Sequence, residues 1–422
     1  MIEQIVKIWN LKDLRNRILY VLGLLILFRV LAHIPMPGVD LTELRNFFAR
    51  NQIFGMLNLF SGGAMRNFSL VMMGVGPYIT SSIIFQLLGM IVPQLEALQK
   101  EGEYGRQKIN QYTRLATVPL AFMQSYAMVY LLHSQNLIGD WSTITMITNL
   151  FSLSAGTILL MWLGELISEK GIGNGVSLII TLGIIGGVPA SLRNTFADFD
   201  AGKAFSTIIF IIIGILATVA IVYFNEAERQ IPVTYARRIR GTKSTGGVET
   251  NLPIRVLMAG VIPIIFALSM MIFPGVIAKF FELARSAWLA NFAKSIANLF
   301  QNNTFYSIAY FFLVIFFTFF YTSIVFKPEQ VAENLQKQGG FIPGVRPGTE
   351  TVSYLKYILQ RITLVGAVFL GLVAVLPYIV QAITNVGTLV LGGTGILIVI
   401  SVVLETMRQV KAQLVMRTYD NY

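Results

Sequence analysis

The chain has 422 residues, of which 55% are hydrophobic and only 13% are charged, and its mean hydropathy is +0.67. A water-soluble globule of this length cannot hide so much apolar surface, so a soluble enzyme is excluded. The sequence contains no cysteine, which excludes a disulfide framework and a thiolate metal site. These properties indicate an integral membrane protein.

The N-terminal region contains two predicted elements. Residues 2–14 place apolar side chains about one helical turn apart among charged ones, which predicts a helix lying on the membrane surface. Residues 18–34 are apolar except for Arg29. Their Ile, Leu, Val and Phe side chains favour insertion by roughly 4–7 kcal/mol, whereas Arg29 costs at most about 3 kcal/mol. The stretch is longer than the apolar core of a signal peptide and lacks a small-residue cleavage site, so we expect a retained span.

Residues 54–66 are apolar but have only about half the length that a membrane-crossing helix needs. A full span follows them directly. Because unpaired backbone groups cannot face lipid, we expect this segment to be re-entrant or to lie against protein. The alternative is a surface loop with an apolar face.

The remaining spans are marked by stretches without Lys, Arg, Asp or Glu: 67–95, 115–139, 141–164, 171–192, 205–224, 256–278, 305–326 and 362–404. The last stretch is too long for one crossing and is interrupted by Pro377, Asn385 and Gly392-Gly393, so it is interpreted as two spans. Together with residues 18–34, this predicts one all-α membrane domain with ten transmembrane helices. Glycines 171, 173 and 175 predict a sharp turn between the fourth and fifth spans.

The spans divide into two sets of five, over residues 17–190 and 205–407. An odd number of spans gives the two sets opposite orientations, which suits a gated central path between two bundles. We therefore expect an N-terminal half at 1–190 and a C-terminal half at 191–422. Ion-coupled transport of a small solute and passive conduction are both compatible with this pattern, although the scarcity of charge in the spans disfavours tight ion coupling.

The basic residues set the orientation. When the loops are assigned alternately, 23 of the 32 Lys and Arg residues fall on the side that holds both termini. The positive-inside rule makes that side cytoplasmic. Its two largest loops, 225–255 and 327–361, are basic and rich in glycine. Their charge either sets topology and contacts anionic lipid or forms a docking surface for a cytosolic partner.

Candidate catalytic groups are scarce. The two histidines, His33 and His133, are far apart in sequence, which disfavours a metal site. The segment 241–244 lacks the glycine that a phosphate-binding loop places before its lysine. Glu165 and Glu405 lie near cytoplasmic span ends and are interpreted as solvated helix ends. We therefore expect no enzymatic activity and no cofactor.

Several ordered motifs resemble the SecY family, whose members form the large subunit of the bacterial protein-conducting channel. The resemblance extends from residues 35–38 to the C-terminal helix. Its motifs are Phe60-Ser61-Gly62-Gly63-Ala64, Pro77-Tyr78-Ile79, Ser82-Ile83-Ile84, Lys100-Glu101-Gly102-Glu103, Gln111-Tyr112-Thr113-Arg114, Gly164-Glu165, Gly171 to Gly175, Ala259 to Pro263, Phe341 to Gly348, and Gly392-Gly393-Thr394.

The resemblance implies a clamshell of ten helices around an hourglass pore, open across the membrane for secreted chains and sideways for membrane segments. It makes residues 54–66 a plug helix that closes the outer funnel, with Phe60, Ser61, Gly62, Gly63 and Ala64 as its motif. It also implies a constriction ring of Ile79, Ile83, Val176, Ile180, Ile265 and Ile398. Branched aliphatic side chains suit this role because they are stiff and resist wetting.

The resemblance further implies a lateral gate between residues 77–92 and 256–274, with Gln86 as a polar contact. Docking of the SecA motor and the ribosome would use Arg346 and the basic loop residues Arg237, Arg238, Arg240 and Lys243. Thr242 replaces a basic residue found in many relatives, which favours motor docking over contact with RNA. The other implied partners are SecE, SecG, signal peptides, preproteins and lipids, in a bacterial plasma membrane.

Overall fold

The structure is a computed structural model. It describes residues 9–37, 39, 41–50, 58, 61–135, 137, 142–197, 204–235, 238–240, 243–245, 249–281, 286–384 and 390–419. Ten helices of at least 16 residues lie in this described part: α2 (Lys12–Leu31), α5 (Gly76–Ile91), α7 (Glu103–Ser134), α8 (Thr143–Lys170), α9 (Gly175–Ala197), α10 (Ala204–Glu226), α11 (Ile262–Phe281), α13 (Asn303–Val325), α15 (Thr349–Thr384) and α16 (Val390–Tyr419). The predicted number of spans is confirmed.

Four of these helices, α7, α8, α13 and α15, are each long and apolar enough to cross a bilayer alone. Helix α5 passes the same test together with α6 (Pro93–Lys100), but the two helices meet at an angle of 99°. The bend follows from Pro93, because proline restricts the preceding residue to extended backbone and Val92 has φ −96° and ψ 113°. Helix α5 is therefore a short span that ends in a surface helix.

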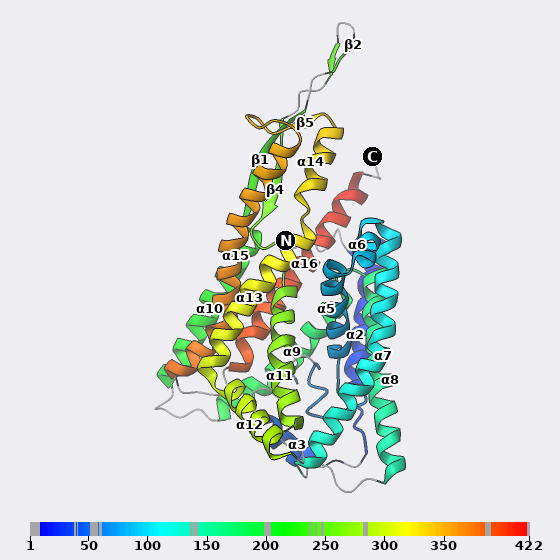
Figure 1. Ribbon diagram of the computed structural model, residues 1–422, viewed down its shortest axis with the longest axis vertical. Coiled ribbons are helices and arrows are strands. Elements are labelled where there is room, and N and C mark those ends of the chain that lie inside the picture. Colours follow the sequence, from blue (N-terminus) through cyan, green and yellow to red (C-terminus); the bar gives the residue numbers. More distant parts are fainter. Residues whose placement is uncertain are drawn as a thin grey trace.

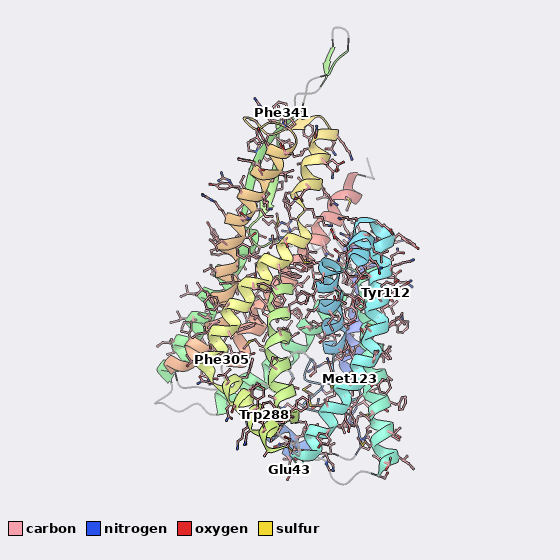
Figure 2. The ribbon with its side chains drawn as sticks, viewed as in Figure 1. Glu43, Tyr112, Met123, Trp288, Phe305 and Phe341 are labelled. Carbon is pink, nitrogen blue, oxygen red and sulfur yellow. The ribbon has the colours of Figure 1, made fainter. Side chains whose placement is uncertain are left out.

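The outer face of the bundle carries the apolar side chains that a membrane requires. On α10, Ile211, Ile215 and Val219 recur every four residues and are all exposed. Figure 2 labels others, including Met123 on α7 and Trp288 on α12 (Ala287–Gln301). Exposed side chains of this kind would be unfavourable in water, so this multi-pass chain has lipid as its solvent.

The described ends of the chain lie at the same end of the molecule. Leu14 of α2 and Val410 of α16 pack in one cluster with Ile172, from the turn between α8 and α9. The end of α16 lies toward α14 (Pro328–Lys337) and the strands, whereas α3 (Leu41–Arg50) and α12 lie at the opposite end (Figure 1). This arrangement agrees with an even number of crossings.

The two basic segments predicted as loops are folded. Strand β1 (Glu228–Tyr235) pairs with β4 (Glu249–Arg255) on one side and with β5 (Gly340–Phe341) on the other, and β2 (Arg238–Arg240) pairs with β3 (Lys243–Thr245). Alternate residues Ile231 and Val233 of β1 are buried against α14 and the first turns of α15. We call this unit, residues 228–255 and 328–359, the sheet module. The two connections predicted as loops thus contain strands and helices and share one small core.

Other boundaries also differ from the sequence interpretation. Residues 2–8 of the predicted surface helix lie outside the described residues, and its last residues, 12–14, belong to α2. Pro377 lies within α15 and Gly392-Gly393 lies within α16, so neither interrupts a helix as predicted. The predicted turn between α8 and α9 is confirmed: Gly171 ends α8, and Gly173 has a φ of +91°.

The contact between α8 and α9 leads to the first prediction. A Cβ added to Gly175 would lie 1.9 Å from the carbonyl oxygen of Gly164, so the two helices require glycine here. We expect Gly175→Ala to lower the free energy of unfolding by about 1–3 kcal/mol. Thermal unfolding of the purified protein in detergent, followed by circular dichroism, measures the change. Gly214→Ala in α10 is the control, because its added Cβ meets nothing within 4 Å; equal melting temperatures for both variants would contradict the prediction.

Candidate functional site

A cavity of about 830 Å³ opens between α5, α7, α8, α9, α11 and α13. Its walls are mostly polar and come from the first turns of α7 and the last turns of α8, which places its mouth at the end of the bundle that carries α6. The lining polar residues include Glu103, Gln107, Asn110, Gln111, Arg114, Glu165, Ser168, Glu169 and Asn174. A polar cavity of this size inside an otherwise apolar bundle provides a path that water can fill.

The inner end of the cavity is aliphatic. Ile79, Val176, Ile180 and Ile265, four of the six residues expected in the constriction ring, line it. The other two, Ile83 and Ile398, do not line the cavity, but they are buried in the same apolar cluster. All six residues, from α5, α9, α11 and α16, therefore belong to this cluster or pack against it, and we call them the aliphatic ring.

The segment expected to be a plug lies inside the bundle and not on its surface. Phe60 and residues 54–57 and 59 lie outside the described residues, whereas residues 61–66 form consecutive turns. We call residues 61–64 the plug tip. Ser61 and Ala64 are buried, and Ala64 packs in the same cluster as the aliphatic ring.

Local hydrogen bonds hold the plug tip in its turns. The hydroxyl of Ser61 donates to the carbonyl of Asn58 at 3.0 Å and accepts from the backbone N–H of Met65 at 3.1 Å. Gly62 and Gly63 have φ of +72° and +80°, a region that favours glycine. Gly62 packs against Gly183 of α9, one turn beyond Ile180. The plug tip therefore contacts α9 about one turn past Ile180, the last residue of α9 that lines the cavity.

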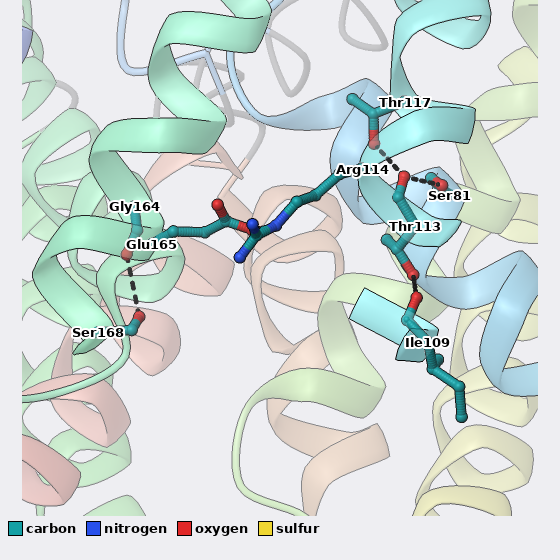
Figure 3. A network of polar contacts seen from close by, with 8 residues as sticks. All are labelled: Ser81, Ile109, Thr113, Arg114, Thr117, Gly164, Glu165 and Ser168. Carbon is teal, nitrogen blue, oxygen red and sulfur yellow. Dashed lines mark hydrogen bonds and ion pairs between the residues drawn. The ribbon is translucent and has the colours of Figure 1, made fainter. Parts of the chain in front are cut away.

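An ion pair that the sequence did not predict crosses the cavity wall (Figure 3). Nε of Arg114 on α7 lies 2.5 Å from Oε1 of Glu165 on α8, and the Glu165 side chain is only 18% exposed. Glu165 is therefore not the solvated helix end that the sequence suggested, whereas Glu405 is exposed. Arg114 and Glu165 both lie in motifs of the family resemblance. They are 51 residues apart in the sequence, and no sequence pattern predicts that their side chains pair.

Neighbouring hydroxyl groups fix the helices around this ion pair. The hydroxyl of Ser81 on α5 donates to the carbonyl of Thr113 on α7 at 2.8 Å, and both residues are buried. The Thr117 hydroxyl donates to the same carbonyl at 2.7 Å. On the opposite wall, the hydroxyl of Ser168 accepts from the backbone N–H of Gly175 at 2.8 Å. Helices α5, α7, α8 and α9 are thus tied together around the cavity by polar contacts.

The expected side exit lies between α5 and α11, which contact each other. Gln86 of α5 and Phe266 of α11 line the cavity together. The side-chain nitrogen of Gln86 donates to the hydroxyl of Ser82 at 3.2 Å, one turn earlier on the same helix. Gln86 therefore faces the cavity, and its hydrogen bond stays within α5.

The expected docking residues that the structure describes belong to the sheet module. Arg346 is exposed in the tip between β5 and α15, where Gly344 and Gly348 have φ of +82° and +106°. The Thr351 hydroxyl donates to the carbonyl of Arg346 at 2.9 Å, which fixes the tip against α15. Arg238 and Arg240 lie in β2 and Lys243 in β3, with Arg240 opposite Lys243, whereas Arg237 lies outside the described residues.

The comparisons with known proteins agree with this architecture. The family model of SecY matches residues 69–407. The chain is 42% identical over 435 residues to the protein translocase subunit SecY of Halalkalibacterium halodurans, and 39% identical over 438 residues to that of Streptomyces scabiei, with 100% of each chain covered. A solved structure described as a protein-conducting channel has a TM-score of 0.65 at 20% identity, covering 93% of this chain and 91% of that chain.

A second solved structure, Sec61 in a canine ribosome–channel complex from the endoplasmic reticulum, has a TM-score of 0.60 at 19% identity and covers the same shares of the two chains. These two likenesses establish the fold. The family match and the full-length identity establish the relationship, and the chain belongs to the SecY family.

Proposed function

We propose that this chain is the channel subunit through which unfolded secretory preproteins cross the membrane, and from which apolar segments pass sideways into lipid. One observation supports the proposal: four residues of the aliphatic ring line a cavity with mostly polar walls, and the buried plug tip packs in the same apolar cluster as the ring. The chain itself supplies the path and its seal. The energy for transport is proposed to come from partner proteins that hydrolyse nucleotide.

The aliphatic ring suits the passage of a polypeptide. Ile79, Ile180 and Ile265 offer no charge or hydrogen bond to a passing side chain, so no residue of a substrate is held tightly. Their branched side chains are stiff and resist wetting, which opposes ion leakage when the pore is closed. The path therefore tolerates many sequences while excluding small ions.

The side exit sorts segments by their solvation. A segment of about 20 apolar residues gains free energy on entering lipid, whereas a polar segment loses it. Because α5 and α11 both line the cavity, separation of these two helices would expose a passing segment to lipid. Gln86 would then contact an arriving signal peptide as a polar group on the gate. Sorting in this scheme is a partition between cavity and bilayer.

The chain is proposed to lie in the bacterial plasma membrane with both termini and the sheet module in the cytoplasm. The excess of Lys and Arg residues on the side that holds both termini supports this orientation. Two halves, residues 1–190 and 191–422, are proposed to move against each other. In support, α9 packs against α16 and α5 packs against α11, contacts that would lie at the boundary between the two halves.

The sheet module is proposed to bind the SecA motor and the ribosome. Arg346 offers an exposed guanidinium on the tip. The hydrogen bond from the Thr351 hydroxyl to the Arg346 carbonyl holds this tip in place. The basic hairpin of β2 and β3, which holds Arg238, Arg240 and Lys243, carries charge suited to acidic protein surfaces or to RNA phosphates. Arg237, which lies outside the described residues, is proposed to contribute to the same binding. The canine structure described above, which includes a ribosome, supports this choice. SecE and SecG are proposed as the membrane subunits of the same complex.

The second prediction tests the path. Because the sequence has no native cysteine, a single cysteine at Ile265 reports one position of the ring. We expect Ile265→Cys to crosslink to a stalled preprotein that carries a short thiol-reactive probe. Ile215→Cys on the exposed face of α10 is the control and should crosslink to lipid analogues only. Crosslinking of the preprotein at position 215 and not at 265 would overturn the proposed path. Solute uptake into vesicles without any motor would instead support a small-solute transporter.

The third prediction tests the docking tip. Arg346→Ala should reduce motor-driven export of a preprotein into membrane vesicles by at least about tenfold, as expected for an arginine that dominates an interface. The melting temperature should not change, because the side chain is exposed. Lys356→Ala removes an exposed positive charge from α15 of the same module and serves as the matched control. Equal export by the two variants would show that net charge, and not the tip, recruits the motor.

A further inference from the structure

Arg29 is the one charged residue in the first apolar stretch, and neither the pore nor the docking surface uses it. In the structure its guanidinium lies between the plug tip and α9. Nη1 donates to the carbonyl of Gly62 at 3.1 Å, and Nη2 donates to the carbonyl of Gly186 at 3.2 Å. A single side chain of α2 therefore bridges the plug tip to the fifth span.

Glycine residues make this bridge possible, because they leave room for the guanidinium and for close backbone contact. A Cβ on Gly186 would lie 2.6 Å from three atoms of the guanidinium, so any larger residue would displace it. A Cβ on Gly183 would lie 2.2 Å from Cα of Gly62. A Cβ on Gly62 would meet the ring of Phe28, the residue before Arg29, at 2.5 Å. The plug tip, α2 and α9 thus meet with bare backbone facing the guanidinium.

The chemistry of the contact favours arginine. Its planar guanidinium carries donors on both terminal nitrogens, so it can bind two carbonyls from two different elements at once. Arg29 is partly buried in the last turn of α2, so less water competes for these donors than at the protein surface, and each bond is stronger than it would be there. When the pore opens and water enters, water can replace the carbonyl of Gly62. The contact is therefore strong in the dry, closed state and weak in the wet, open state.

We propose that Arg29 is a positioning residue that latches the plug tip to α9 and keeps the pore closed until water and a preprotein enter. This inference rests on the proposed function, because that function makes residues 61–64 a plug. The positive charge of Arg29 would thus hold the plug tip in place, which the aliphatic ring does not do. The ring closes the middle of the path, and the latch holds the plug tip behind it.

A cysteine reporter tests the latch without any preprotein. Ala64→Cys in the plug tip and Ala367→Cys in α15 replace alanines that are both 0% exposed. Labelling with a water-soluble maleimide is measured on membranes that contain the full complex. Adding Arg29→Gln should raise the labelling rate at position 64 by about tenfold, the effect of losing a charge-assisted hydrogen bond. The rate at position 367 should not change. Arg29→Lys should give a smaller increase in the labelling rate, since lysine keeps the positive charge but lacks the two terminal nitrogens of the guanidinium.

A second pair of variants leaves Arg29 in place. Gly186→Ala displaces the guanidinium and should also raise the labelling rate at position 64. Gly187→Ala, on the next residue of α9, adds a Cβ that meets nothing within 4 Å and should leave the rate unchanged. Unchanged labelling at position 64 in both Arg29→Gln and Gly186→Ala would overturn the latch. So would an equal rise at positions 64 and 367, which would reveal general loosening.

Export of a preprotein, measured on the same membranes, separates the two hypotheses. If the parent chain exports no preprotein, the proposed function fails, and the labelling rates still decide whether Arg29 holds the plug tip. If export is normal but the rates do not respond to Arg29, the latch fails and the channel stands. Ion current across a planar bilayer should rise in Arg29→Gln together with the labelling rate.

Discussion

A bilayer offers no hydrogen bonds, so every irregular piece of backbone within it must be covered by protein. The segment 61–75 meets this constraint by lying inside the bundle. The backbone N–H of Met36 donates to the carbonyl of Phe68 at 2.8 Å, and that of Leu70 donates to the carbonyl of Ile34 at 3.2 Å. Gly156 of α8 has no side chain where the carbonyl of Leu70 approaches. The re-entrant segment therefore requires glycine at this position of the helix that covers it. The need to cover its backbone constrains how the surrounding helices pack.

The same constraint explains what the sequence could predict. Stretches without charge located the spans, and the short length of residues 54–66 predicted a re-entrant segment. The ring residues followed from the family resemblance, because isoleucine alone does not distinguish a pore from a helix packing surface. The Arg114–Glu165 pair and the β1–β4 pairing were missed, since both join residues that only the folded chain brings together. Two basic segments interpreted as separate loops proved to share one core, for which alternation in so short a strand gave too weak a signal.

The energy of Arg29 shows how a charge is retained in a span. An arginine at the centre of a membrane helix costs about 2.5–3.5 kcal/mol, but Arg29 lies in the last turn of α2, where the cost is smaller, and the apolar residues around it can offset that cost during insertion. Each charge-assisted hydrogen bond contributes about 1.5–3 kcal/mol in a folded protein. Two such bonds, to Gly62 and Gly186, are therefore large enough to offset the remaining insertion cost. The residue that weakens the first span as an isolated helix stabilises the packed bundle.

Two kinds of interaction then divide the work of closing the path. The aliphatic ring acts through apolar contacts, which are non-directional and change little as one residue of a polypeptide replaces another. The plug tip is held by directional hydrogen bonds and by glycine contacts that fit one arrangement only. A ring built from directional contacts would bind some substrates and stall, while a plug held only by apolar contacts would slip. In the proposed function, the separation of the two roles would allow one channel to be tightly shut at rest and indifferent to sequence once it is open.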